Sequence, residues 1–221
     1  MSISHSTRRV SLGALVLCLL ILPAVVRAQG VREAQADPRW PPVATFSIVG
    51  FDPETGEMGV AVQSKVFSVG NGVTWGEAGV GVVATQAWVD VSYGPQALEL
   101  LRQGLSPSEV VETILENDPD PYPERWPEAG RQFSVMNAKG EVTGGHLSFR
   151  LLAALEAGQA AGGDRRGMQS AAMLIIKEDG GVWLNNDVVL RLQVDDSPEP
   201  IQELRRLVEI AAEQRAMVGG G

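Results

Sequence analysis

The alternation of apolar and polar residues after residue 44 predicts a sheet whose first part is a hairpin. Thr45–Phe51 (TFSIVGF) is an apolar run rich in strand-forming residues, and Glu57–Lys65 (EMGVAVQSK) follows as its return strand. The turn residues Asp52-Pro53-Glu54-Thr55-Gly56 lie between them. Beyond a glycine-rich stretch at Val69–Gly76, the run Ala78–Ala87 (AGVGVVATQA) predicts a further buried strand.

The middle of the chain has the spacing of helices. Tyr93–Gly104 carries its apolar residues on one face and ends in a glycine suited to a helix C-cap. Ser106-Pro107-Ser108-Glu109 has the pattern of a capping box and opens a second helix, Pro107–Glu116. After a proline-rich connection, Arg131–Asn137 predicts a strand that pairs with the segment around Glu141.

The last third predicts a helix, several strands and a closing helix. The predicted elements are a helix over Phe149–Ala161, a buried strand over Ser170–Lys177, continuing strands at Val182–Leu184 and Val188–Val194, and an amphipathic helix from Glu199 to about Met217. Strands, a helical pair, further strands and a terminal helix are typical of a layered α+β domain. We therefore expect one domain over residues 45–217.

The first 28 residues have the features of a secretory signal peptide. Two arginines and no acidic residue precede an apolar run at Leu12–Val26, and Val26-Arg27-Ala28 fits the small-x-small cleavage rule. An uncleaved membrane anchor is the alternative, but the run is shorter than the roughly 20 residues that span a bilayer. Residues 29–44 are polar and proline-containing, which predicts a linker or pro-segment. The expected location is the periplasm or the outside of the cell.

Composition excludes several classes of function. The net charge is −9, and removal of residues 1–28, which hold three arginines and no acidic residue, makes it about −12. This charge argues against nucleic acid and, after signal cleavage, against a membrane as partner. Cys18 is the single cysteine and lies in the signal peptide, so the mature chain has no disulfide or thiol nucleophile. Only two histidines occur, His5 and His146, so we expect no multi-histidine metal site and no cofactor.

Several segments resemble one family along nearly the whole mature chain. TFSIVGFDPETGEMGVAVQSKVFSVG and AGVGVVATQAWVDVSYGPQALELLRQGLS are similar to the domain-of-unknown-function 1028 family, as are RQFSVMNAKGEV, LLAALEAGQAAGGDRRGMQSAAML and LRLQVDDSPEPIQELRRL. That family is regarded as a branch of the N-terminal-nucleophile (Ntn) hydrolases. The resemblance implies a four-layer αββα sandwich, hydrolysis of an amide C–N bond in a small-molecule or peptide-like substrate, and assemblies such as homo-oligomers.

One departure from the family pattern affects the expected fold. Family members usually carry several dozen residues after the strand that matches Arg131–Val142, including a glycine-rich segment and a helix. Here the stretch Gly144–Phe149 leads almost directly to Leu151. The resemblance therefore implies an Ntn-hydrolase-like αββα sandwich that lacks a central strand and helix block, through a deletion or a faulty gene model.

Thr45 is the candidate nucleophile. An N-terminal threonine can attack a carbonyl with its hydroxyl while its own α-amine, with a pKa of about 8, accepts the proton. Thr45 opens the first predicted strand, where the resemblance places such a nucleophile, but Ala44 precedes it and must first be removed. The alternative is a β-prone residue that merely begins a strand.

Four further residues are candidates for the same site. Lys65 ends the return strand of the hairpin, where an ammonium would lower the pKa of the Thr45 amine; otherwise it is a solvated lysine. Ser64 points to the opposite face, so either residue can border Thr45. Asn71, between two glycines, can donate to an oxyanion or form an ordinary turn. Asn186 can orient the amine or belong to a turn.

Two charged segments have ordinary structural explanations. Asp195-Asp196 precedes the terminal helix, where carboxylates are stabilised by the helix N-terminus. Gly162–Gly167 lacks the ending of a phosphate-binding loop and is predicted to be a plain loop.

The leading hypothesis is an exported Ntn-type amide hydrolase with Thr45 as nucleophile. The alternative from another class is a secreted or periplasmic binding module that keeps the fold without catalysis. A truncated, poorly folded product is the third hypothesis.

Overall fold

The computed structural model describes residues 45–86, 90–118 and 145–219. The predicted signal peptide, the linker at residues 29–44 and the strand pair of Arg131–Asn137 with the Glu141 segment lie outside the described residues. The fold is mixed α+β, with two antiparallel sheets and five helices in the described part of the chain.

The larger sheet has four antiparallel strands in the order β1-β2-β5-β6. They are β1 (Phe46–Phe51), β2 (Met58–Ser64), β5 (Ser170–Ile176) and β6 (Val188–Val194). The predicted hairpin is confirmed, since Phe46 pairs with Gln63 and Phe51 with Met58. All residues of β5 are buried, as expected for a central strand covered on both faces.

The smaller sheet consists of β3 (Thr74–Glu77) and β4 (Gly81–Ala84). The predicted buried strand at Ala78–Ala87 is wrong at both ends and in its burial. Residues 78–80 form the turn between β3 and β4, with Gly79 at φ +72°. Thr85 and Gln86 lie beyond β4, whose residues are only half-buried. The glycine-rich stretch before it forms the short helix α1 (Gly70–Val73) and then β3.

The other helices agree closely with the predicted ones. They are α2 (Tyr93–Arg102), α3 (Pro107–Glu116), α4 (Leu147–Ala160) and α5 (Pro200–Gly219). The predicted capping box is formed, because the Glu109 carboxylate accepts from the Ser106 N–H at 2.8 Å and Ser106 Oγ accepts from the Glu109 N–H. Gly104 follows α2 at φ +90°, the conformation for which a C-terminal glycine is suited. None of these helices is long and apolar enough to cross a membrane.

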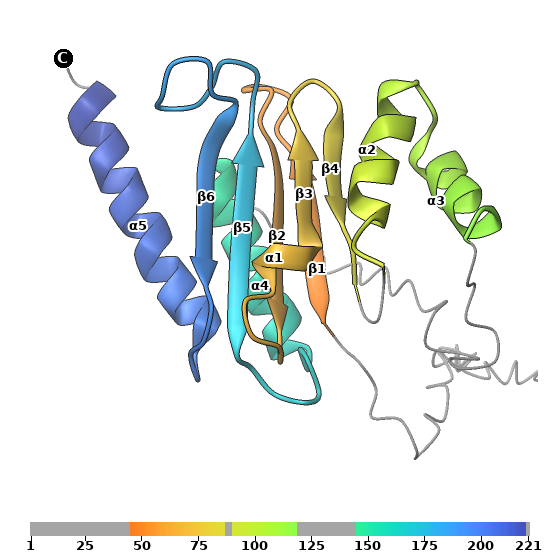
Figure 1. The fold of residues 1–221 in the computed structure, drawn as a ribbon. Helices are drawn as coiled ribbons and strands as arrows, with labels where there is room; N and C mark the ends of the chain where they lie inside the picture. The colour runs from red at the N-terminus through yellow and green to blue at the C-terminus, as the bar shows by residue number, and fades with distance from the viewer. Residues whose placement is uncertain (1–44, 87–89, 119–144, 220–221) are drawn as a thin grey trace, which may run out of the picture. The chain divides into compact units, whose positions relative to one another are not determined.

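The elements pack in layers around the four-stranded sheet (Figure 1). Helices α4 and α5 cover one face, and the core there consists mainly of Phe46, Ala61, Leu151, Leu152, Leu155, Met173, Ile175, Leu204 and Val208. The β3-β4 sheet covers much of the other face through Val60, Leu174 and Ile176. Helix α2 packs against the outer side of β3 and β4, and α3 packs against α2.

The prediction of a strand at Val182–Leu184 is wrong. These residues lie in the connection between β5 and β6, and their exposed fractions are 69%, 75% and 97%. The Gly181 N–H donates to the Asn186 carbonyl at 2.7 Å, and Asn185 has a φ of +56°. The segment therefore forms a wide loop, and its apolar side chains are exposed rather than buried.

Candidate functional site

The pairing of β2 with β5 brings two distant segments to one end of the sheet. Thr45 directly precedes β1, and Ser64, the last residue of β2, pairs with Ser170, the first residue of β5. The connection from α4 to β5 therefore comes alongside Thr45. Two of its residues, Asp164 and Arg166, reach into the space between the strand ends.

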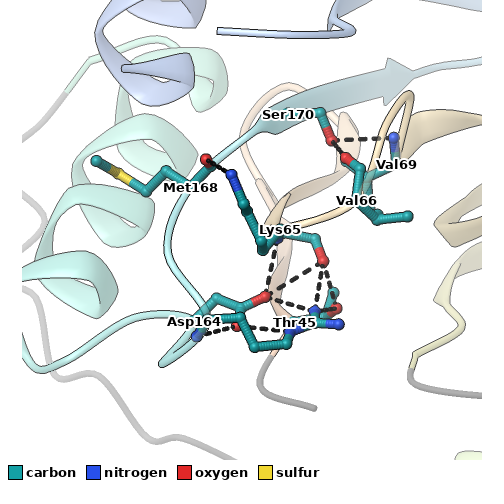
Figure 2. A network of polar contacts seen from close by, with 9 residues as sticks. Thr45, Lys65, Val66, Val69, Asp164, Met168 and Ser170 are labelled. Atoms are coloured by element: carbon teal, nitrogen blue, oxygen red, sulfur yellow. Dashed lines mark hydrogen bonds and ion pairs between the residues drawn. The ribbon is translucent and has the colours of Figure 1, made fainter. Parts of the chain in front are cut away.

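Thr45, Ser64, Asp164 and Arg166 form a connected polar cluster, part of which Figure 2 labels. The Thr45 Oγ1 atom lies 2.6 Å from Ser64 Oγ. Arg166 Nη2 donates to Ser64 Oγ at 3.2 Å and to Thr45 Oγ1 at 3.4 Å. A guanidinium group thus stands beside the threonine hydroxyl.

Asp164 anchors this cluster from within the protein. Its side chain is fully buried and forms an ion pair with Arg166 at 2.6 Å. It also accepts from the backbone N–H of Lys65 at 2.9 Å. Burial raises the pKa of Asp164, but the hydrogen bonds from Arg166 and Lys65 and the charge of Arg166 outweigh it, so the pKa is lower than usual. Asp164 is therefore ionised at neutral pH.

The ionised carboxylate determines which hydroxyl group donates and which accepts in this cluster. Asp164 only accepts and Arg166 only donates. Ser64 Oγ lies 3.4 Å from Asp164 Oδ2, to which it donates. With its own proton used in this way, Ser64 accepts the proton of the Thr45 hydroxyl. The Thr45 oxygen then keeps its lone pairs for an electrophile or for Arg166.

The Lys65 side chain points away from Thr45. Its ammonium group donates to the Met168 carbonyl at 3.2 Å and is exposed, while its backbone N–H serves Asp164 (Figure 2). The cation beside Thr45 is Arg166 rather than Lys65.

Gln86 closes the other side of Thr45. The orientation of its amide that satisfies both ends has the nitrogen donating to the Thr45 carbonyl at 2.9 Å and the oxygen accepting from the Ser47 N–H at 3.1 Å. Gln86 thereby pairs with the outer edge of β1 much as a neighbouring strand would. Its neighbour Thr85 is buried and bonds to the Gly72 and Val73 carbonyls.

Two candidate residues do not join this cluster. The Asn71 Oδ1 atom accepts a hydrogen bond from Gln193 at 3.3 Å. Gln193 of β6 lies in the same row of paired residues as Ser47, which is two residues after Thr45. The row crosses three strand spacings, or about 14 Å, from β1 to β6. Asn186 lies in the β5–β6 connection at the opposite end of the sheet, where its Oδ1 accepts from the Val188 N–H at 2.9 Å. Asn186 is a turn residue.

Asp164 and Arg166 were missed by sequence reasoning, which predicted only a plain loop for Gly162–Gly167. The available signal was an aspartate followed by two arginines among glycines, just before a buried strand. These side chains reach Thr45 only because β2 pairs with β5, and the periodicity of the sequence does not reveal that pairing. The other acidic pair also differs from expectation, since Asp195 accepts from Gln193 and Asp196 from Gln169 instead of capping α5.

A family model described as a family of unknown function, DUF1028, matches residues 45–145 and 141–204. The chain belongs to the DUF1028 family. The matched residues include all four members of the Thr45 cluster.

The fold is also that of a solved DUF1028 protein. The chain is similar to protein SPO2555 from Silicibacter pomeroyi, whose crystal structure is described as DUF1028, with 26% identity and a TM-score of 0.60. The similarity covers 76% of this chain and 89% of that protein. No curated protein matches the chain. Within the described residues no group of three or more His, Cys, Asp or Glu residues could hold a metal ion.

Proposed function

We propose that this DUF1028 chain is an exported hydrolase of the N-terminal-nucleophile type, with Thr45 as nucleophile and an amide C–N bond as target. The observation that carries the proposal is the Thr45 hydroxyl, 2.6 Å from Ser64 Oγ and flanked by the Arg166 guanidinium. The order of layers, with helices outside two facing antiparallel sheets, supports the same class. The substrate is a small-molecule or peptide-like amide.

The proposed reaction uses groups of this cluster at each step. Once the peptide bond between Ala44 and Thr45 is cut, the free α-amine of Thr45 takes the proton of its own hydroxyl as Oγ1 attacks the acyl carbon. The C–N bond then breaks, the amine product leaves with that proton, and water releases the acyl group from Oγ1. Arg166 stabilises negative charge near Oγ1 and lowers the pKa of the amine, which keeps it neutral and basic.

We also propose that the chain lacks a central strand and helix block of its family. The two family matches meet at residues 141–145, next to the Gly144–Phe149 junction where the resemblance placed the missing block. The walls of a substrate pocket near Thr45 would be affected first.

The mature N-terminus tests both export and the nucleophile. The full chain with a C-terminal tag is expressed in a bacterial host, and the intact mass is measured in the exported fraction. We expect a chain that begins at Thr45, and retention inside the cell when residues 1–28 are deleted. An active protein whose chain still begins at Gln29 would disprove the mechanism, because the amine of Thr45 would be blocked.

A β-lactone that acylates threonine hydroxyls tests the site without knowledge of the substrate. We expect one adduct on Thr45 of the processed protein, retained in Thr45→Ser and absent in Thr45→Ala. Arg166→Gln should slow its formation about 100-fold, because a donor aimed at the reacting oxygen is lost. Thr113→Ala, in helix α3, is the matched control and should react normally. Equal labelling of Thr45→Ala would rule Thr45 out.

A further inference from the structure

A groove lies beside β3 because the two sheets differ in width. The larger sheet has four strands and the smaller sheet two, and β3 packs over β5 and β2 while β4 packs over β2 and β1. The face of β6 that points away from α5 is left beside them. The groove there has a volume of about 370 Å³.

Residues of β6, β5, β3, α1 and α2 line this groove. Its floor holds Arg191 and Gln193 of β6, and its walls hold Asn71 of α1, Thr74 and Trp75 of β3 and Leu98 of α2. The alternation of β6 explains the floor, since Leu190, Leu192 and Val194 face the core under the helices.

The charge of the groove is unusual for this chain. Arg191 is the one charged side chain among the lining residues, although the chain has 27 acidic and 18 basic residues. Arg191 makes no hydrogen bond or ion pair with the residues that the structure describes. The nearby Asp195 carboxylate accepts hydrogen bonds from Gln193 and Ser68, which lower its pKa. It is therefore charged, and these two partners already occupy it.

Asn71 supplies a second donor to the same groove. Asn71 Oδ1 accepts from Gln193 Nε2 at 3.3 Å, which leaves the amide nitrogen of Asn71 without a partner among the described residues. A guanidinium and an amide N–H₂ facing one space are donors suited to a carboxylate.

The remaining wall is apolar and held in place. The Trp75 indole N–H donates to the Gly72 carbonyl at 3.2 Å, and the ring packs closely on Gly94 of α2. Leu98, which is 8% exposed, adds a small aliphatic surface. Small-molecule sites combine such walls with a few placed polar groups, and this groove lies in their usual range of volume.

We propose that this groove binds a small carboxylate that carries an apolar or aromatic group, of the size of an N-acylated amino acid. Arg191 and Asn71 hold the carboxylate, and Trp75 and Leu98 contact the apolar group. The site does not depend on hydrolysis at Thr45, since Thr45 directly precedes β1 while Gln193 lies in β6, and β2 and β5 lie between those two strands.

Two probes that differ only in charge test the proposal on the full chain. N-acetyl-L-phenylalanine and its neutral amide are titrated by calorimetry and by the NMR signal of the Trp75 indole N–H, assigned through its loss in Trp75→Phe. We expect the acid to bind at least about 10-fold more tightly than the amide, as for a charge-assisted hydrogen bond. Arg191→Gln should remove that difference and leave binding of the amide unchanged.

Matched variants separate this result from effects of net charge and of folding. Arg206→Gln in α5 removes the same charge from an exposed arginine paired with Glu203, and should leave the affinity unchanged. Thr45→Ala should also bind the acid normally. A failure of the hydrolase proposal would therefore leave this binding result unchanged, and the two proposals can fail independently. Three results would each overturn the proposal. The first is equal affinity for the acid and the amide, and the second is an Arg191→Gln variant that still distinguishes them. The third is no shift of the Trp75 indole signal with N-acetyl-L-phenylalanine or with hexanoate, an aliphatic carboxylate.

Discussion

At the scale of single residues, Asp164 is the buried charge on which the Thr45 cluster depends. Its carboxylate receives Arg166 and the Lys65 backbone N–H, and no water-facing surface of its side chain remains. A buried carboxylate in such a place stabilises the fold only while its partners are present and it is ionised.

Asp164→Asn should therefore destabilise the protein at neutral pH by about 2 kcal/mol, because Arg166 loses its counter-charge. The pKa of Asp164 is lower in the folded state than in the unfolded chain. Its stabilisation is thus present above about pH 4 and lost as the pH falls through the folded value. Urea unfolding at pH 7 and in acid should show a smaller difference between wild type and Asp164→Asn in acid.

Glu112→Gln is the matched control for that variant. Glu112 is exposed on α3, and its replacement removes the same charge without touching the cluster. A difference between wild type and Asp164→Asn that stayed constant with pH would contradict this account.

At the scale of elements, the contact of α2 with β3 depends on one glycine. A Cβ atom on Gly94 would lie 2.3–2.4 Å from the Trp75 ring. The ring cannot easily move, because its N–H donates to the Gly72 carbonyl and to Thr85 Oγ1.

Gly94→Ala should destabilise the protein by about 2 kcal/mol, although alanine favours a helix by about 1 kcal/mol, because the clash exceeds that gain. Guanidinium unfolding would measure the loss. Gln96→Ala, on the exposed side of the same helix, should stay within about 0.5 kcal/mol of wild type. A stabilised Gly94→Ala variant would show that α2 shifts freely over β3.

At the scale of the whole molecule, a histidine joins the β1–β2 turn to two helices. His146 Nδ1 accepts from the Ser148 N–H at the start of α4, and Nε2 lies 3.4 Å from Glu57 and 3.0 Å from Arg215 of α5. Burial, together with the charge of Arg215, lowers the pKa of His146 against the opposing effect of Glu57 and Asp52.

Stability should therefore fall as the pH drops below about 6.5, since the unfolded chain binds a proton there that folded His146 resists. His146→Gln should flatten the dependence of the melting temperature on pH between about 7.5 and 5.5. His5→Gln removes the other histidine and serves as the control, because His5 belongs to the predicted signal peptide. An unchanged pH profile in His146→Gln would show that another group is responsible.

The sequence by itself predicted the elements whose signals are local. The hairpin of β1 and β2, the capping box of α3, the glycine after α2 and the buried strand β5 all depend on neighbouring residues, and all are confirmed. Val182–Leu184 was misplaced because apolar character alone does not distinguish a strand from an exposed loop. The approach of Ser64 to Thr45 follows from the hairpin register and was within reach of sequence reasoning.

Only the tertiary structure decided what surrounds that hydroxyl pair. Asp164 and Arg166 stand about 100 residues further along the chain, and they reach Thr45 because β5 pairs with β2. The pairing of β6 with β5 brings Gln193 to Asn71, which lies in the groove instead of beside Thr45. Periodicity determines which face of a strand is buried, but not which strand lies next to it. Strand order is a property of the whole chain, and here it determines which side chains can act together.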